Sequence, residues 1–477
     1  MPGPSLCIYA GTLLAAAWAQ EPAGVVVHAA PPPAETSAGL LEAELSNGLR
    51  VTIVSDPMLT HEAVVIRVGV GSAHEAADEH GLAHMVEHLM FAGTERYPRE
   101  AWWDLQDGLG ATSNAFTRRD DTTYHTVLPP LGVGTVLEME ADRLANFDVQ
   151  HEQLERERGV VLDELRLRYG MEPHARLGVR LQRELLGEHP YGRPVGGEAA
   201  AVDALDIAAV TAFHERHYGA RNVHLVLVGP LAAVPLLLRI EALYGALPAG
   251  QRPTPPPPLA AIDMARRIDV GDPTLRTREN GLVWQLPPDR ICAEGEDRSD
   301  CDQAYWAGQI MLALLRGEGS ATIQVRMARI IGGGVPVTLD VWRSDQGGLV
   351  TLYARRHRGV PLAMYQFGAI MGALVGVVLP IKGQPTFYRM ETAVRGADTD
   401  WIDEQAIDEV RASVRRHELA RSWDPLARAL AIAAGTERGA TELSERLDGL
   451  EAVSASAVLQ LYQDWFLDVP GVRVHVR

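Results

Sequence analysis

Cysteine and positive charge are both scarce in this chain of 477 residues. Of its three cysteines, Cys7 lies in an apolar leader, while Cys292 and Cys301 bracket a polar segment. Either a Cys292–Cys301 disulfide or two free thiols fits this spacing. The 44 Lys and Arg residues are outnumbered by 62 Asp and Glu residues, which gives a net charge of −18. Because phosphate binding needs clustered cations, this balance argues against a nucleic-acid partner.

Long apolar runs are missing as well, so we expect no membrane span. The nearest candidate, residues 362–381, contains Gln366 and four Gly or Pro residues. The apolar run at residues 6–18 is too short to cross a bilayer. It ends in the small-x-small cleavage pattern Ala17-Trp18-Ala19, although no Lys or Arg precedes it. We therefore expect residues 1–19 to be a signal peptide and the protein to be periplasmic or secreted.

Proline-rich segments indicate how the remaining chain is divided. Residues 20–40 predict a flexible spacer, and residues 251–262 predict an extended linker. This linker separates an N-terminal domain, residues 41–250, from a C-terminal domain of similar fold, residues 263–477. The two halves also end alike, because apolar residues recur at a constant offset (458 − 210 = 248): Val210, Phe213 and Tyr218 match Val458, Leu461 and Phe466.

The pattern of strands and helices predicts the fold class. Asn47-Gly48 between two alternating runs predicts a hairpin with a two-residue turn, and later segments alternate between helical and strand periodicity. With the repeat at the ends of the halves, this pattern favours an α+β fold with two homologous domains. We expect each to be a mostly antiparallel sheet with helices packed on one face.

The strongest chemical signal is a predicted helix over residues 81–91 that carries His84, Glu87 and His88. Two imidazoles four residues apart share one helix face and can bind one zinc ion. Glu87 lies beside that face, where its carboxylate can reach a water molecule on the metal. The order H-x-x-E-H is a metallopeptidase signature, the inverse of the common H-E-x-x-H. Apolar residues surround this trio on nearly all sides, so a solvated helix face does not explain it.

Zinc needs a third protein ligand, and a predicted helix over residues 152–168 offers two candidates. Glu157 and Glu164 share a helix face with apolar side chains, where carboxylates are costly unless they are paired or metal-bound. Spacing alone does not choose between them, and arginines on the same helix offer simple ion pairs instead. His80 is a rival ligand, but Gly81 marks the helix start and leaves His80 outside it.

These segments resemble the pitrilysin and insulinase family of inverted zincin metallopeptidases, and most of all its bacterial branch similar to mitochondrial processing peptidase. The resemblance covers nearly the whole chain after the leader and rests on the segments 47–51, 81–94, 114–117, 157–164 and 189–194. It implies that Glu164 is the third zinc ligand and that Glu157 helps to orient the catalytic site. It also implies that an extended peptide binds beside Asn114, Ala115, Phe116 and Thr117.

The function that this resemblance implies is a zinc-dependent endopeptidase with one Zn²⁺ per chain. Such enzymes enclose the site in a chamber, so we expect short or unfolded peptides as substrates. Glu87 would be the general base for a zinc-activated water. Two other functions stay open: a non-catalytic assembly subunit of a two-chain peptidase, and a zinc-buffering protein. The intact Glu87 argues against the assembly subunit, because scaffolding needs no base.

The second half has no H-x-x-E-H and also departs from the family at a second point. Domains that complete a site in this family carry Arg and Tyr seven residues apart, and here Ala328 and Val335 fill those positions. Because such donors stabilise charge on the substrate carbonyl, we expect a heterodimer with a related chain that supplies them. The alternative is a homodimer or monomer in which Arg326 or Arg329 does this.

Overall fold

The computed structural model describes residues 25–29, 39–262, 266–272, 274–275, 277–288, 298–316, 337–357, 390, 394, 402–435, 443–468 and 471–476. The expected signal peptide, most of the expected spacer, and Cys292 lie outside the described residues. So do Arg326, Ala328, Arg329, Val335 and the apolar segment 362–381. The disulfide and the substitution of the Arg and Tyr positions therefore stay predictions.

The N-terminal sheet has seven strands in the order β1-β2-β3-β7-β4-β6-β5. All its neighbours are antiparallel except β3 and β7. The central strands are rich in β-branched residues and buried on both faces, as expected for strands covered on two sides. The bounds are β1 (Val25–Ala29), β2 (Gly39–Leu45), β3 (Arg50–Ser55), β4 (Glu62–Val68), β5 (Thr112–Thr117), β6 (Thr122–Leu128) and β7 (Val223–Gly229).

The predicted hairpin forms, but its turn is one residue longer than expected. The main-chain N–H of Leu45 donates to the carbonyl of Leu49, so residues 46–48 make a three-residue loop between β2 and β3. Gly48 adopts a φ of 88° there, a left-handed conformation that glycine reaches without strain. The Asn47 side chain does not serve the turn alone, because its Nδ2 donates to the carbonyl of Tyr244 at 2.8 Å.

Helices of the N-terminal half pack on one face of this sheet, where their apolar residues and the inward side chains of β3, β4 and β7 form one core. Short helical turns connect several of these elements. The α-helices are α2 (Leu82–Leu89), α3 (Arg99–Leu109), α4 (Val133–Ala145), α5 (His151–Leu165), α6 (Pro173–Leu186), α7 (Ala199–Ala204), α8 (Ile207–His217) and α9 (Ala233–Tyr244). The short turns are η1 (Ser72–His74), η2 (Arg166–Met171, a π-helix), η3 (Pro190–Gly192) and η4 (Ala220–Asn222).

The C-terminal sheet has five described strands in the order β10-β11-β9-β12-β8. This order repeats β5-β6-β4-β7-β3 of the first sheet strand for strand, and β12 pairs parallel with β8 as β7 does with β3. The two halves are therefore homologous domains, as expected. The strands are β8 (Arg267–Val270), β9 (Thr277–Leu286), β10 (Val337–Ser344), β11 (Gly347–His357) and β12 (Val472–Val476).

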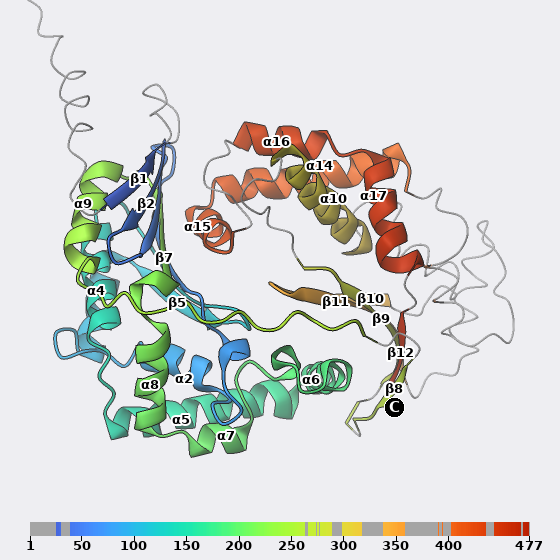
Figure 1. Ribbon diagram of the computed structural model, residues 1–477, viewed down its shortest axis with the longest axis horizontal. Helices are drawn as coiled ribbons and strands as arrows, with labels where there is room; N and C mark the ends of the chain where they lie inside the picture. The colour runs from blue at the N-terminus through green and yellow to red at the C-terminus, as the bar shows by residue number, and fades with distance from the viewer. Residues whose placement is uncertain are drawn as a thin grey trace, which may run out of the picture.

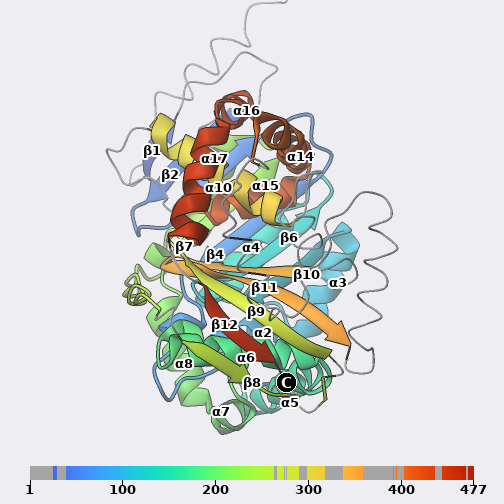
Figure 2. The same cartoon turned by 90° about the vertical axis from the view of Figure 1, so that its right-hand side faces the viewer.

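Helices cover one face of the C-terminal sheet too (Figure 2). The last of them, α17 and η5, carry the residues of the predicted repeat, and β12 follows them as β7 follows α8. The helices are α10 (Arg298–Arg316), α14 (Glu404–Ser422), α15 (Pro425–Ala433), α16 (Leu443–Glu451), α17 (Ala455–Tyr462) and η5 (Gln463–Leu467, a π-helix). No helix among the described residues is long and apolar enough to cross a membrane.

Each domain contributes one helix to the outer face of the other domain's sheet. Leu177, Leu181 and Leu185 lie four residues apart on α6, and they pack on the outer face of the C-terminal sheet. In return, Ala429 and Ile432 of α15 pack on the outer face of the N-terminal sheet. Figure 1 shows α6 beside the strands of the second sheet and α15 beside β7. Each sheet is thus covered on its second face by the other domain, which the sequence did not indicate.

Because of this exchange, we propose the domain bounds 41–250 and 263–477 as divisions of the chain rather than as independently folding units. The linker between them is not a free tether, since the carbonyl of Pro257 lies 2.9 Å from His189 Nε2. The main-chain N–H of Ile262 donates to Gln285 Oε1 of β9 at 3.0 Å. The linker therefore lies along both domains.

Candidate metal centre

Helix α2 is buried almost completely, and its polar side chains are set in an apolar surround. His84 and Glu87 are 7% and 9% exposed, while the leucines, methionine and valine of the helix contribute to the core. Gly81 precedes the helix with φ 96° and provides no side-chain cap. Instead, the carboxylate of Glu75 accepts hydrogen bonds from the N–H groups of Gly81 and Ala83, each at 3.0 Å. A carboxylate at a helix N-terminus is favourable, so Glu75 fixes where α2 begins.

Three side chains meet at one point between α2 and α5. Glu164 Oε2 lies 3.5 Å from His84 Nε2 and 3.6 Å from His88 Nε2. One donor atom from each residue lies within 4.8 Å of the others, and the described residues hold no other such group of His, Cys, Asp and Glu. Two imidazole nitrogens and one carboxylate oxygen form a donor set that fits a catalytic zinc site. His80 stands outside this group, because α2 begins only at Leu82.

The charges at this point favour a cation. Burial lowers the pKa of His84 to about 4, which keeps its imidazole in the neutral form that binds metals. Burial also opposes protonation of His88, but the hydrogen bonds that His88 donates to Glu157 and Glu164 outweigh it and raise its pKa to about 9. The same contact with His88 is the main reason that the pKa of Glu164 falls to about 2. These interactions therefore favour a positive charge at the place where the three donor atoms converge.

Glu157 occupies a different position from Glu164. Its Oε2 lies 3.4 Å from Nδ1 of His88, the ring nitrogen that faces away from the shared point. Its Oε1 accepts from Arg99 at 2.9 Å and lies 3.4 Å from Arg156 Nε. Glu157 is therefore placed to hold the ring of His88, whereas Glu164 is placed to bind beside it. Sequence spacing left the choice between these two glutamates open.

Glu87 lies on the same helix as the two histidines but outside the group of converging donors. The hydroxyl of Thr117 donates to Glu87 Oε2 at 2.5 Å, which ties the carboxylate to the end of β5. Burial raises the pKa of Glu87, and the Thr117 hydrogen bond opposes this effect. The sequence predicted Thr117 only as a substrate contact, and nothing in the linear spacing pointed to a bond between these residues.

Strand β5 is the last strand of the N-terminal sheet among the described residues. One of its edges pairs with β6, and no described strand pairs with the other. Asn114 is exposed, while Ala115, Phe116 and Thr117 are half-buried. An edge of this kind can accept an extended peptide as a further strand.

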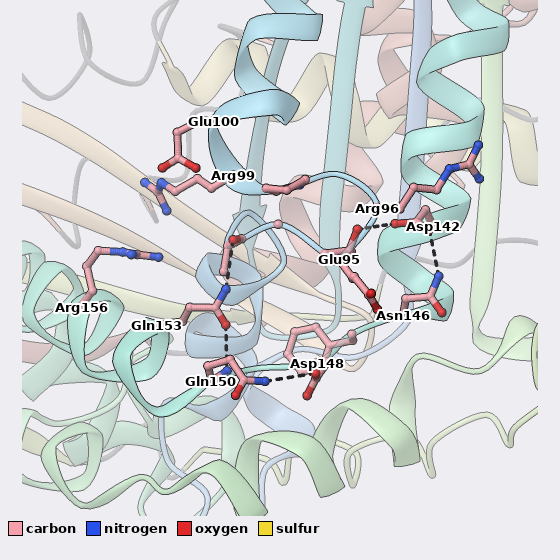
Figure 3. A pocket seen from close by; sticks show the side chains of 15 residues that line it. Glu95, Arg96, Arg99, Glu100, Asp142, Asn146, Asp148, Gln150, Gln153 and Arg156 are labelled. Carbon is pink, nitrogen blue, oxygen red and sulfur yellow. Dashed lines mark hydrogen bonds between the residues drawn. The ribbon is translucent and has the colours of Figure 1, made fainter.

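An open pocket of about 1200 Å³ lies between the starts of α3 and α5 and the end of α4 (Figure 3). None of the three converging donors lines it. Its polar walls are largely internally bonded: Asp142 accepts from Thr94 and Asn146, and Gln153 donates to the carbonyl of Ala92. Arg99 joins the pocket wall to Glu157, so the pocket belongs to the surroundings of the site.

Comparison with known proteins identifies the family of this chain. The model described as Insulinase (Peptidase family M16) matches residues 50–198, and the model described as Peptidase M16 inactive domain matches residues 204–327. The chain belongs to peptidase family M16. The first match includes every residue of the metal centre described above. The second agrees with the absence of H-x-x-E-H from the second half.

Named relatives of this M16 chain include zinc proteases. It is 31% identical over 224 residues to an uncharacterized zinc protease of Mycobacterium leprae, a match that covers 47% of this chain and 50% of the relative. It is 28% identical over 200 residues to a probable mitochondrial-processing peptidase subunit beta of Arabidopsis thaliana, covering 42% of this chain and 38% of the relative. The matches thus span about half or less of these curated relatives. They support a peptidase as the family activity and zinc as the family metal.

A solved structure matches almost the whole M16 chain. A protease from Helicobacter pylori superposes with a TM-score of 0.71 at 18% identity, covering 92% of this chain and all of that one. At this identity the likeness shows the fold, which is the two-domain arrangement expected from the sequence. The predicted family and fold class are both confirmed.

Proposed function

We propose that this chain is a zinc-dependent endopeptidase that hydrolyses peptide bonds in short or unfolded peptides. The observation that carries the proposal is the convergence of His84, His88 and Glu164, with Glu87 on the same buried helix. Three protein ligands leave one position for water and substrate, which is the arrangement of catalytic rather than structural zinc sites. We assign one Zn²⁺ per chain to these three residues.

When bound, zinc supplies Lewis acidity, which lowers the pKa of water and polarises the scissile carbonyl. Glu87 takes the proton of the attacking water and passes it to the leaving amine. The Thr117 hydroxyl holds Glu87 Oε2, which fixes the position of the carboxylate that takes the proton. Glu157 keeps the ring of His88 oriented through Nδ1, and Arg99 in turn holds Glu157.

The free edge of β5 indicates which class of substrate the site would accept. A peptide that adds a strand beside Asn114, Ala115, Phe116 and Thr117 must be extended over several residues. Folded proteins seldom present such a segment, whereas short or unfolded peptides do. Pairing along this edge also brings the peptide past Thr117, whose hydroxyl contacts the proposed base.

Two wider proposals rest on the sequence. The signal-peptide pattern of residues 1–19 supports a periplasmic or secreted location. Ala328 and Val335, at the positions where the family carries Arg and Tyr, support a heterodimer, in which a related chain supplies an Arg and Tyr to the substrate carbonyl. A non-catalytic assembly subunit is disfavoured because the buried Glu87, costly to a fold that does not use it, is retained.

The proposed function is tested with purified chain, zinc analysis by mass spectrometry and a library of quenched fluorescent peptides. We expect close to one zinc per chain and zinc-dependent cleavage of extended peptides, with loss of cleavage after chelation and recovery on adding zinc. Zinc binding without cleavage by the chain, alone or with a related M16 chain, would favour the assembly subunit or the zinc-buffering protein.

A further inference from the structure

The tips of two equivalent hairpins meet at the domain interface. The turn at residues 118–121 joins β5 to β6, and the turn at residues 345–346 joins β10 to β11, which hold the same places in the second sheet. The main-chain N–H of Asp345 donates to Asp120 Oδ2 at 3.2 Å. The C-terminal domain thereby touches the loop that ends the proposed substrate strand.

Trp342, near the end of β10, makes two side-chain contacts at this junction. The guanidinium of Arg119 lies over its indole ring, 4.8 Å from the ring centroid. The ring of Tyr191 meets the same indole edge-on at 5.4 Å, and the Tyr191 hydroxyl donates to Asp120 Oδ1 at 2.5 Å. Burial lowers the pKa of Arg119 to about 10, so its side chain stays cationic at neutral pH. A cation over an indole face is attracted by the ring quadrupole.

The other side of the turn is held by the N-terminal domain. The N–H groups of Ser72 and Ala73 donate to the carbonyls of Arg118 and Arg119 at 3.1 and 2.9 Å. Gly71 packs so closely that a Cβ there would lie 2.3 Å from the Arg118 carbonyl oxygen. The turn is therefore clamped between residues 71–73 and the C-terminal hairpin, and Arg119 is also held within the N-terminal half by the carbonyl of Tyr191 and Oε1 of Gln182.

The clamped turn leads directly to the proposed base. Arg118 follows Thr117 in the chain, and the Thr117 hydroxyl is the group that donates to Glu87 Oε2 at 2.5 Å. A displacement of the turn must therefore shift the last residue of β5, its free edge and the Thr117 hydroxyl together. Misplacement of a reacting group by about 1 Å can cost about a hundredfold in rate.

We propose that Trp342 of the C-terminal domain is a positioning residue for catalysis, which acts through Arg119 and the end of β5 on Thr117 and Glu87. This inference rests on the proposed peptidase function. It gives the domain that lacks the metal motif a role in the reaction of the other domain, because its hairpin completes the clamp on the substrate strand.

The test compares three variants of the full chain. Trp342→Leu removes the aromatic face and keeps an apolar side chain, whereas Trp342→Phe keeps a face for Arg119. Arg428→Gln is the matched control, because it removes another interdomain ion pair, to Asp56 at 3.4 Å, where α15 packs on the outer face of the N-terminal sheet. For each, we would measure kcat, KM and zinc content, and amide hydrogen exchange of peptides covering residues 112–121.

We expect Trp342→Leu to lower kcat about tenfold to a hundredfold at parental zinc content, and to speed exchange in residues 112–121. Trp342→Phe should recover most of both losses, and Arg428→Gln should leave both unchanged. Parental kcat in Trp342→Leu, or unchanged exchange of residues 112–121, would overturn the inference. A parent that binds zinc but cleaves no peptide would instead defeat the proposed function, and the exchange result would still decide whether Trp342 holds β5.

Discussion

Glu157 Oε2 lies 3.4 Å from Nδ1 of His88, on the side of the imidazole ring opposite to Nε2. Nε2 is the atom that approaches Glu164, at 3.6 Å. One histidine ring therefore lies between two carboxylates, to which we assign different tasks. Glu157 is bonded in turn to Arg99 and Arg156, so its position is fixed before any metal binds.

This relationship predicts a graded effect of Glu157→Gln. The amide keeps the shape but weakens the charge-assisted contact to His88, so we expect the affinity for zinc to fall roughly tenfold to a hundredfold without being lost. Competition with a fluorescent zinc chelator measures it. A loss of zinc as complete as in Glu164→Gln would mean that Glu157 binds the metal itself.

Replacement of Glu87 by Gln should remove activity and keep the metal. The amide cannot accept the proton of the attacking water, and general-base contributions are commonly about 10²–10⁴ in rate. We therefore expect peptide hydrolysis to fall by at least about a hundredfold, with zinc content unchanged. Glu215→Gln, at an exposed position on α8, is the matched control. Activity within a few-fold of the parent would take the base role away from Glu87.

The ligand assignment is tested by three single substitutions. Loss of one of three protein ligands should weaken zinc binding more than loss of a supporting contact, so Glu164→Gln and His88→Ala should lose most of their zinc. His80→Ala should retain it, because His80 lies outside the group of converging donors. Zinc per chain after dialysis, measured by mass spectrometry, decides the matter. Retention of metal by Glu164→Gln together with its loss in His80→Ala would reverse the assignment.

The purified chain should be weakly active alone and be stimulated by a related chain that lacks H-x-x-E-H and carries the Arg and Tyr. Preorganised donors at the substrate carbonyl are commonly worth a hundredfold or more, about 3 kcal/mol. We therefore expect a rise of that order in kcat/KM, together with a heterodimer peak in size-exclusion chromatography. Full turnover by the single chain, unaffected by the second, would instead support the homodimer or monomer.

Acid should destabilise the fold through buried histidines that do not belong to the metal centre. Burial lowers the pKa of His214 to about 3, and its ring stacks on Phe147 at 4.1 Å and on Tyr218 at 4.6 Å. The unfolded chain, with a pKa near 6.5, binds this proton first, so stability is complete above pH 6.5 and falls as the pH drops toward 3. The slope is about 1.4 kcal/mol per pH unit for each such histidine.

The variant His214→Phe should remove this share of the acid sensitivity. Between pH 7 and pH 4.5, the variant should lose roughly 2–3 kcal/mol less unfolding free energy than the parent. The reason is that it has no imidazole at position 214 to take up a proton on unfolding over the roughly two pH units below 6.5. Urea unfolding at both pH values measures the difference. An equal loss in the variant and the parent would show that His214 is not buried in its neutral form.

Much of the site was predictable because helix geometry is local. His84 and His88 are four residues apart, and any α-helix brings such residues to one face. The apolar residues around them predicted burial, and the Asn47-Gly48 pair predicted the hairpin, apart from the length of its turn. The offset between the last helices of the halves predicted the repeated fold, because equal apolar spacing reflects packing against equivalent sheets.

Sequence by itself determined the helix that carries the two histidines and Glu87, the family and the repeated domain. Only the tertiary structure decided how Glu157 and Glu164 differ, that Thr117 bonds to Glu87, and that Trp342 reaches the turn after β5. Periodicity shows which residues share a face, but it does not show which element that face meets. The angle between α2 and α5 and the exchange of α6 and α15 depend on packing between segments far apart in the chain, and no local pattern records that packing.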